Sequence, residues 1–299
     1  MASTPVVTRR AATGKARPSR PPARRARTRR RAPRRSPWPF AVIAVLIAVV
    51  GLSLNHRQEV PEPVASQCTV SGSDVSVTTE QAANAATIAA VARSRGLPAR
   101  ATVVALATAQ QESRLRNLDH GDRDSLGLFQ QRPSQGWGTA EQVQDPVYAA
   151  GTFFDHLVQV PGWETGRLTE VAQAVQRSGF PEAYQQWEPL ATTLADALLS
   201  TTPTQWTCSF PAAAAAGTVA DRSAALTTAV RREAGAPTVE PDGTVSVAGA
   251  GWPEASWAVA HAQGLGLGVV SLDGWRWTPE GGWVSSPAAF ATPLQLRLG

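Results

Sequence analysis

Apolar and polar positions divide the chain into segments of different character. An uncharged apolar run, Trp38–Leu54, follows a polar N-terminal stretch. From about residue 76 to 210, apolar residues recur with the spacing of one helix face. From about residue 238 onward, short apolar runs alternate with turns that contain glycine, a pattern typical of strands. These patterns predict a mainly α domain after a single transmembrane helix, followed by a small α+β C-terminal unit.

The first domain opens with two predicted helices. A capping box at Thr78–Gln81 predicts a helix that runs to about Gly96. Pro98 opens a second helix, which is apolar from Ala101 to Ala109 and turns polar before Glu112. We therefore expect a buried helix whose last turn emerges into a cleft. Further helices are expected near residues 141–158, 167–178 and 187–200.

The C-terminal unit combines both types of element. Helices are predicted near residues 221–234 and 254–263. Short strands are expected at Val269–Leu272, Trp275–Trp277, Trp283–Val284 and Leu294–Leu298. Five tryptophans lie in this part of the chain: Trp252, Trp257, Trp275, Trp277 and Trp283. Their rings either stack on carbohydrate or form the core of this small unit, and the core is the interpretation we favour.

Charge is distributed unevenly. Residues 1–36 hold 13 of the 28 Lys and Arg residues and no Asp or Glu, so the rest of the chain has a net charge of −8. Such a segment cannot bury enough apolar surface to fold. Positive charge clusters before the apolar run and not after it, which predicts a cytoplasmic N-terminus and residues 55–299 outside. A cleaved signal peptide is the alternative, although its basic segment would be unusually long.

These features predict a single-pass plasma-membrane protein with its C-terminal domains outside the cell. We expect the basic tail to set topology, and we expect no nucleic-acid partner. The expected segments are a disordered basic cytoplasmic tail at 1–37, a transmembrane helix at 38–54, a linker at 55–75, the helical domain at 76–210, a linker at 211–220 and the Trp-rich α+β region at 221–299.

The chain has two cysteines, Cys68 and Cys208, which flank the helical stretch. Paired thiols outside the cell usually form a disulfide. We therefore expect a bond that joins the two ends of one domain.

Glu112 is the candidate for chemistry. It ends a helix whose inner face is otherwise apolar. A carboxyl group in that position is partly desolvated, which raises its pKa. A raised pKa suits a general acid that protonates a glycosidic oxygen near neutral pH.

The residues around Glu112 carry a family resemblance. Glu112–Ser113 is followed by Gly121–Asp122 and then by Gly127–Gln130, with the sequence Gly-Leu-Phe-Gln. This order resembles the lysozyme-like superfamily, specifically soluble lytic transglycosylases and goose-type lysozymes, over roughly residues 78–200. The resemblance implies a helical fold with a groove for a β-1,4-linked amino-sugar polymer, that is, for peptidoglycan glycan strands.

The resemblance also implies a role for each matching residue. Glu112 corresponds to the catalytic acid, and Asp122 to a loop carboxylate that holds a water. Four residues would serve the substrate: Ser113 by hydrogen bonds to backbone or sugar, Gly127 by close approach, Phe129 by packing and Gln130 by bonds to sugar amides.

Two positions depart from the family pattern. Gln131 and Arg132 stand where the goose-type branch often has another acid. Many relatives carry a Tyr-Asn pair in a later helix, where this chain has Gln176–Arg177. Tyr148 or Tyr184 is left as the candidate to support the acid.

The mechanism follows from the number of carboxylates. One assured acid, Glu112, favours a lytic transglycosylase, in which the substrate's own C6 hydroxyl closes an anhydro ring; a water held by Asp122 would permit hydrolysis. The alternative function is a catalytically inactive module that binds peptidoglycan. We expect no cofactor and no metal, because no His or Cys has metal-ligand spacing and three loop acids, Asp119, Asp122 and Asp124, lack a later bidentate Glu.

Overall fold

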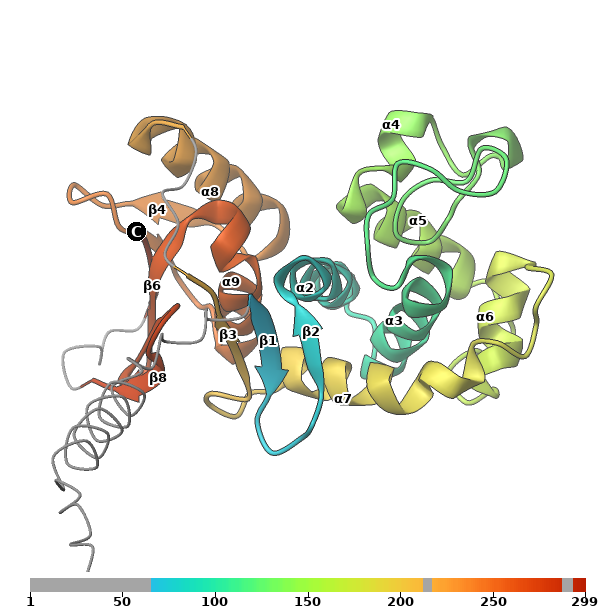
Figure 1. Ribbon diagram of the computed structural model, residues 1–299, viewed down its shortest axis with the longest axis horizontal. Coiled ribbons are helices and arrows are strands. Elements are labelled where there is room, and N and C mark those ends of the chain that lie inside the picture. The colour runs from blue at the N-terminus through green and yellow to red at the C-terminus, as the bar shows by residue number, and fades with distance from the viewer. Residues whose placement is uncertain (1–65, 212–216, 287–292) are drawn as a thin grey trace, which may run out of the picture. The chain divides into compact units, whose positions relative to one another are not determined.

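A computed structural model describes residues 66–211, 217–286 and 293–299 (Figure 1). Those residues form eight α-helices, two short 3-10 helices and nine strands in two sheets. They belong to one compact unit. The helical region and the C-terminal region therefore pack together in a shared structure.

The prediction of a mainly α first domain was wrong. Strands β1 (Gln67–Val70), β2 (Ser76–Thr78) and β3 (Trp206–Ser209) form an antiparallel sheet in the order β2-β1-β3. The sheet brings together the two ends of the helical region. Each strand has only three or four residues, which is too short for an alternating pattern to stand out in the sequence.

The predicted disulfide is confirmed. Cys68 and Cys208 face each other across β1 and β3, and their sulfur atoms are bonded. Both side chains are almost completely buried. The bond therefore closes a loop that contains the whole helical region.

The membrane part of the fold-class prediction is not supported. No helix in the three described stretches is long and apolar enough to cross a membrane. The predicted span, Trp38–Leu54, lies outside the described residues.

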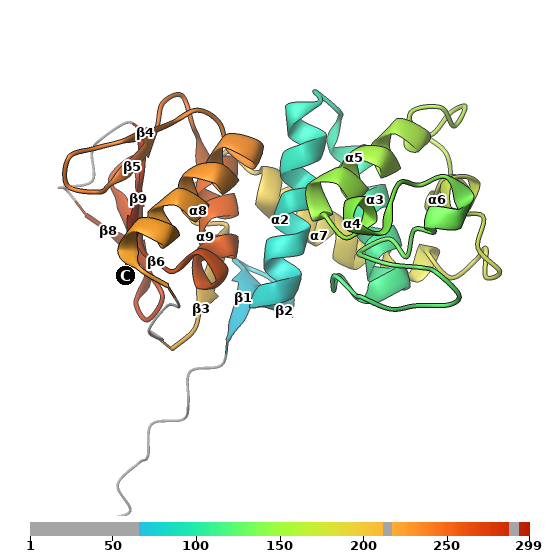
Figure 2. The ribbon, with the colours of Figure 1, turned by 90° about the horizontal axis from the view of Figure 1, so that it is seen from above.

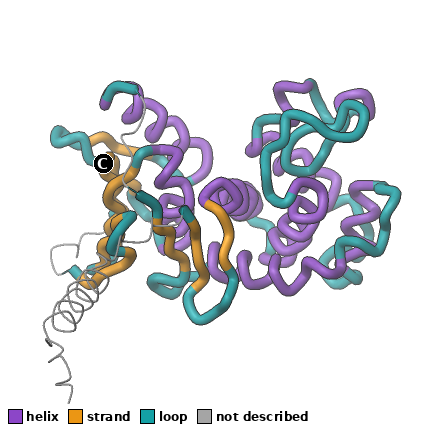
Figure 3. The backbone as a smooth tube through the Cα atoms, in the orientation of Figure 1, coloured by secondary structure: helices purple, strands orange, loops and turns teal. Residues whose placement is uncertain are grey.

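Helices surround the long helix α3 (Ala99–Ser113), which is buried along most of its length. It packs on α7 (Glu188–Leu199) and on α2 (Thr79–Ser94), whose predicted capping box is formed. The remaining elements of this region are η1 (Pro133–Gln135), α4 (Ala140–Val143), α5 (Pro146–Leu157), α6 (Leu168–Gln176) and η2 (Gln185–Trp187). Helices α5 and α6 also contact α3 (Figures 1 and 3).

The C-terminal region is built on a larger sheet than the sequence indicates. It has six strands, all antiparallel, in the order β4-β5-β9-β6-β7-β8. The strands are β4 (Pro237–Val239), β5 (Val245–Val247), β6 (Leu267–Leu272), β7 (Trp275–Thr278), β8 (Gly282–Ser285) and β9 (Leu294–Leu298). Helices α8 (Val219–Glu233) and α9 (Trp252–Leu265) lie between this sheet and α2 (Figures 1 and 2).

The C-terminal tryptophans belong to the packing. Trp257 and Trp277 are fully buried, and Trp252 is nearly so. The indole nitrogen of Trp277 donates to the carbonyl of Cys208 at 3.2 Å. Trp277 thus joins the two sheets, and these three buried rings are not available to stack on carbohydrate.

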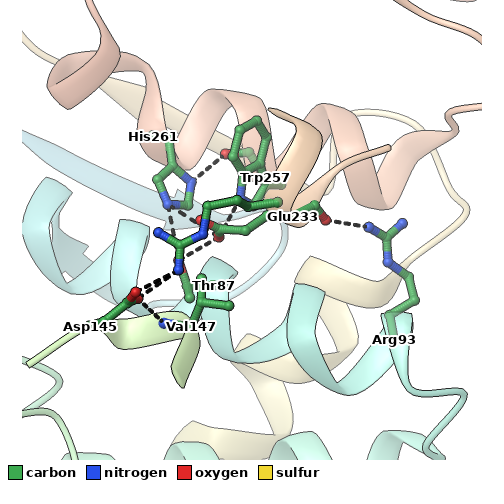
Figure 4. A network of polar contacts seen from close by, with 8 residues as sticks. Thr87, Arg93, Asp145, Val147, Glu233, Trp257 and His261 are labelled. Carbon is green, nitrogen blue, oxygen red and sulfur yellow. Dashed lines mark hydrogen bonds and ion pairs between the residues drawn. The ribbon is translucent and has the colours of Figure 1, made fainter. Parts of the chain in front are cut away.

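A buried carboxylate joins the C-terminal region to the helical region (Figure 4). Glu233, at the end of α8, accepts hydrogen bonds from the Thr87 hydroxyl of α2 at 2.7 Å and from the Trp257 indole at 2.9 Å. His261 lies 3.9 Å from the same oxygen. Burial lowers the pKa of His261, with an opposing effect of the Glu233 charge. Three elements, α2, α8 and α9, therefore meet at one side chain.

Replacement of Glu233 by Ala should destabilise the fold. The substitution leaves the Trp257 indole without its acceptor and leaves the Thr87 hydroxyl only the His261 ring, whose Nε2 lies 3.2 Å away. A buried unpaired donor costs roughly 1–3 kcal/mol. Urea unfolding followed by circular dichroism measures the effect. Glu240→Ala, at an exposed position, is the matched control and should leave the free energy of unfolding nearly unchanged. Equal stability of the two variants would contradict the proposed role of Glu233.

Candidate active site

The end of helix α3 carries the predicted acid. The helix is buried from Ala101 to Gln110, and in its last turn Gln111 and Glu112 become partly exposed. Arg114 ends the helix with a left-handed backbone, φ 58°. Glu112 and Ser113 therefore lie at the point where a buried helix meets a cavity.

Glu112 is half-buried and hydrogen-bonded. The Tyr184 hydroxyl donates to its Oε1 at 2.6 Å. Burial raises the pKa of Glu112, and the polar side chains of Tyr184 and Gln176 act in the opposite direction without cancelling the effect of burial. The carboxyl group thus holds its proton at a higher pH than an exposed glutamate does.

Tyr184 is held beside the acid by its own surroundings. Its side chain is fully buried, and burial followed by the Glu112 charge raises its pKa, so the phenol stays a donor. The segment that carries it continues into η2, where the Trp187 indole donates to Gln111 Oε1 at 2.7 Å. This bond fixes the segment to the residue before Glu112.

The Gly127–Gln130 segment is hydrogen-bonded to the ends of two helices near Glu112, α3 and α6. The Ser113 hydroxyl donates to the Leu128 carbonyl at 2.7 Å, with the Ala109 carbonyl at 3.0 Å as a second acceptor. The Gln176 amide of α6 donates to the Phe129 carbonyl at 2.8 Å. Ser113 and Phe129 therefore support the site from below, and neither lines the cavity.

Gly121 and Gly127 are required where the chain comes too close to other atoms for a side chain. Gly127 has φ 76°, and a Cβ there would lie 2.2 Å from the Val143 carbonyl oxygen. A Cβ on Gly121 would lie 2.0 Å from Gln130 Oε1. Gly127 thus allows a close approach to protein backbone, where the resemblance implied an approach to sugar. Gly121 leaves room for Gln130.

A cavity of about 300 Å³ lies in front of Glu112. Of the residues expected to act, it brings together Glu112, Asp122 and Gln130. Gln130 has φ 49°, and its amide donates to the Gly127 carbonyl at 3.2 Å. The other residues that line the cavity are Ser125, Gln131, Arg132, Gln135, Trp137, Gln176, Arg177, Ser178 and Gly179.

The second predicted carboxylate, Asp122, is at the rim. Its side chain is 91% exposed, and its nearest charged partner is Arg123 at 4.0 Å. Asp124, two residues on, is instead fixed by the Arg132 guanidinium at 2.9 Å and the Ser134 backbone amide at 2.8 Å. Asp122 therefore has no rigid position comparable with that of Glu112.

The neighbouring loop acids have separate partners. Asp119 lies 2.7 Å from the His120 ring, whereas Asp124 pairs with Arg132. Within the described stretches, no group of three His, Cys, Asp or Glu side chains is arranged to hold a metal ion.

Sequence reasoning left the partner of the acid open between Tyr148 and Tyr184, and the structure places Tyr184 there. It also treated Gln176–Arg177 only as a departure, although both residues line the cavity. Gln176 is the last residue of α6, and Arg177 ends that helix with φ 52°. The end of a predicted helix at this point was the feature of the sequence that could have indicated these two residues.

Comparison with known proteins adds no assignment: no protein-family model and no curated protein matches the chain.

Removal of the Tyr184 hydroxyl should raise the pKa of Glu112 further. Its hydrogen bond favours the charged carboxylate, so Tyr184→Phe favours the protonated form. Carboxyl titration by NMR measures the pKa directly. Tyr148→Phe changes the chain's other tyrosine, which lies outside the residues that line the cavity, and should leave the Glu112 titration unchanged. An unchanged or lowered pKa in Tyr184→Phe would refute this role.

Proposed function

We propose that this chain cleaves the glycan strands of peptidoglycan, with Glu112 as general acid and then general base. The observation that carries the proposal is the half-buried carboxyl group at a cavity, held by Tyr184 and with a raised pKa. The resemblance of the motifs between Glu112 and Gln130 to those of lytic transglycosylases and goose-type lysozymes supplies the substrate class.

In the first step, protonated Glu112 transfers its proton to the glycosidic oxygen. The bond from that oxygen to the anomeric carbon breaks, and positive charge develops on the sugar ring. Glu112 becomes a carboxylate at this moment. The Tyr184 hydroxyl already lies 2.6 Å from its Oε1 and stabilises the new charge.

In the second step, the Glu112 carboxylate removes the proton from the C6 hydroxyl of the same muramoyl residue. That oxygen bonds to the anomeric carbon and closes a 1,6-anhydro ring. Glu112 regains the proton that it gave to the leaving sugar. The reaction balances without water and without a second carboxylate.

The position of Asp122 favours this route over hydrolysis. Hydrolysis by two carboxyl groups requires both at a fixed separation. The Asp122 side chain is 91% exposed, and among the described residues it makes no hydrogen bond that would fix it. We therefore favour transglycosylation.

The disulfide supports a location outside the cytoplasm, where peptidoglycan lies. Disulfides persist in oxidising compartments and are rare in the cytosol. The bond between Cys68 and Cys208 is buried in the sheet that closes the helical region. Attachment to the plasma membrane stays a prediction from the sequence.

A second candidate function is a module that binds peptidoglycan without cutting it. One observation favours it: Gln131, at a position where relatives often have an acid, has a structural role. Its amide donates to the Ala149 carbonyl at 3.1 Å, and only 2% of the residue is exposed.

Glu112→Gln should abolish cleavage. Incubation of the full chain with purified peptidoglycan, followed by mass analysis of the products, should give anhydro-muropeptides. Because general acid–base catalysis contributes roughly 100- to 10,000-fold, Glu112→Gln should lower their release by about that factor. The variant should remain folded, since the charged form of a half-buried carboxyl group does not stabilise the fold.

Asp122→Asn is the matched control and should keep most of the activity and the anhydro products. Products with reducing ends that disappear in Asp122→Asn would establish hydrolysis instead. Retention of the chain on peptidoglycan, without products and without any change in Glu112→Gln, would favour the binding module and refute the enzyme.

A further inference from the structure

A second, larger cavity adjoins the one in front of Glu112. Its volume is about 590 Å³, and it shares four wall residues with the first: Gln135, Trp137, Gln176 and Arg177. Beyond them it extends along α5 and α6 to His156 and Gln159. The two cavities therefore form a continuous depression with Arg177 at their boundary.

Arg177 is the cation available at this boundary. Arg132, the other arginine of the wall, is held by Asp124 at 2.9 Å. Among the described residues, no ion pair and no side-chain hydrogen bond includes Arg177, and the residue is exposed. Its guanidinium can therefore pair with an anion from a ligand without first losing a partner.

The backbone of Arg177 is fixed even though its side chain is exposed. It caps α6, and its amide donates to the Gln173 carbonyl at 2.8 Å. The preceding residue, Gln176, is bonded to the Phe129 carbonyl beside the acid. The point from which the Arg177 side chain extends is thus at a set position relative to Glu112, and the guanidinium itself is free to reach a ligand.

The second cavity offers contacts of a different kind from those of a simple sugar groove. The Trp137 ring lies against the His156 ring, with centroids 4.3 Å apart, and forms an aromatic wall. Gln135 and Gln159 supply amide groups that can bond to peptide groups. The volume is in the range that holds ligands of several hundred daltons and exceeds the need of a single carboxylate.

We propose that the second cavity binds the peptide stem of a muramoyl residue, and that Arg177 pairs with a stem carboxylate. The proposal rests on peptidoglycan as the substrate. N-acetylated sugar rings are neutral, so a free arginine beside them needs an anion from a substituent. A charge-assisted pair of this kind is strong and geometrically specific. The chain then distinguishes glycan that carries stems from glycan without them.

Binding measurements test this directly. The full chain with Glu112→Gln, which prevents turnover, is titrated with three soluble ligands: a disaccharide that carries a tetrapeptide stem, the stem-free disaccharide with its lactyl carboxylate, and neutral chitobiose. Arg177→Gln should weaken binding of the first ligand about tenfold, since hydrogen bonds to charged groups contribute at that level. Arg177→Lys, which keeps the charge, should lose less.

The matched control is Arg167→Gln. Arg167 lies at the opposite end of α6, pairs with Glu182 and lines neither cavity. Its replacement should leave all three affinities unchanged.

Each other outcome overturns the inference. Equal weakening for the stem-bearing and stem-free disaccharides would assign Arg177 to the lactyl carboxylate. If Arg177→Gln weakened the binding of chitobiose as well, Arg177 would contact the sugar. If it weakened no affinity, Arg177 would have no part in ligand recognition. Failure of the chain to bind the stem-bearing ligand would also refute the proposal.

Failure of the proposed enzymatic function is a separate result. A wild-type chain that releases no products from peptidoglycan, but binds the stem-bearing ligand through Arg177, would refute catalysis and leave stem recognition intact.

Discussion

The site depends on how two consecutive backbone carbonyls, those of Leu128 and Phe129, find their hydrogen-bond donors. Both belong to a loop segment that regular secondary structure does not pair. Ser113 at the end of α3 supplies one donor, and Gln176 at the end of α6 supplies the other. A buried carbonyl without a donor is costly, so these bonds tie the segment to both helices. Glu112 precedes Ser113 directly, and its surroundings are set by the same two bonds.

The C-terminal region is connected to this arrangement through the start of α5. Arg232 pairs with Asp145. The Asp145 carboxylate also caps α5 at Val147 (Figure 4). The residue before Asp145, Gln144, exchanges hydrogen bonds with the loop that follows α3: its carbonyl accepts from Asn117, and its amide donates to the Leu118 carbonyl. That carbonyl also accepts from the Gly127 backbone amide at 2.7 Å. The C-terminal region thus stabilises the walls of the site without contributing a residue to it.

The sequence predicted the parts of the structure that rest on local pattern. The capping box at Thr78, the buried helix that ends at Glu112 and the cysteine pair are examples, because each signal lies within one segment or in the count of two thiols. The short strands β1 and β3 were missed, since their stability comes from each other across most of the chain and from the disulfide, not from a local pattern. The six-stranded sheet was underestimated for the same reason. Tyr184 could not be chosen over Tyr148, because only the packing of η2 on α3 brings it to Glu112.

The proposed mechanism requires one carboxyl group to serve as both acid and base, and the hydrogen bond from Tyr184 suits Glu112 to both roles. Burial alone favours the protonated form of a carboxyl group. Such a group binds its proton tightly but donates it poorly, because the carboxylate that forms would be desolvated. Tyr184 and Gln176 offset part of that effect and lower the cost of the charged form. Catalysis in both directions is most effective when neither protonation state is strongly preferred near the working pH. A group that alternates between the two roles therefore needs burial together with a fixed neutral donor, and that combination is found at Glu112.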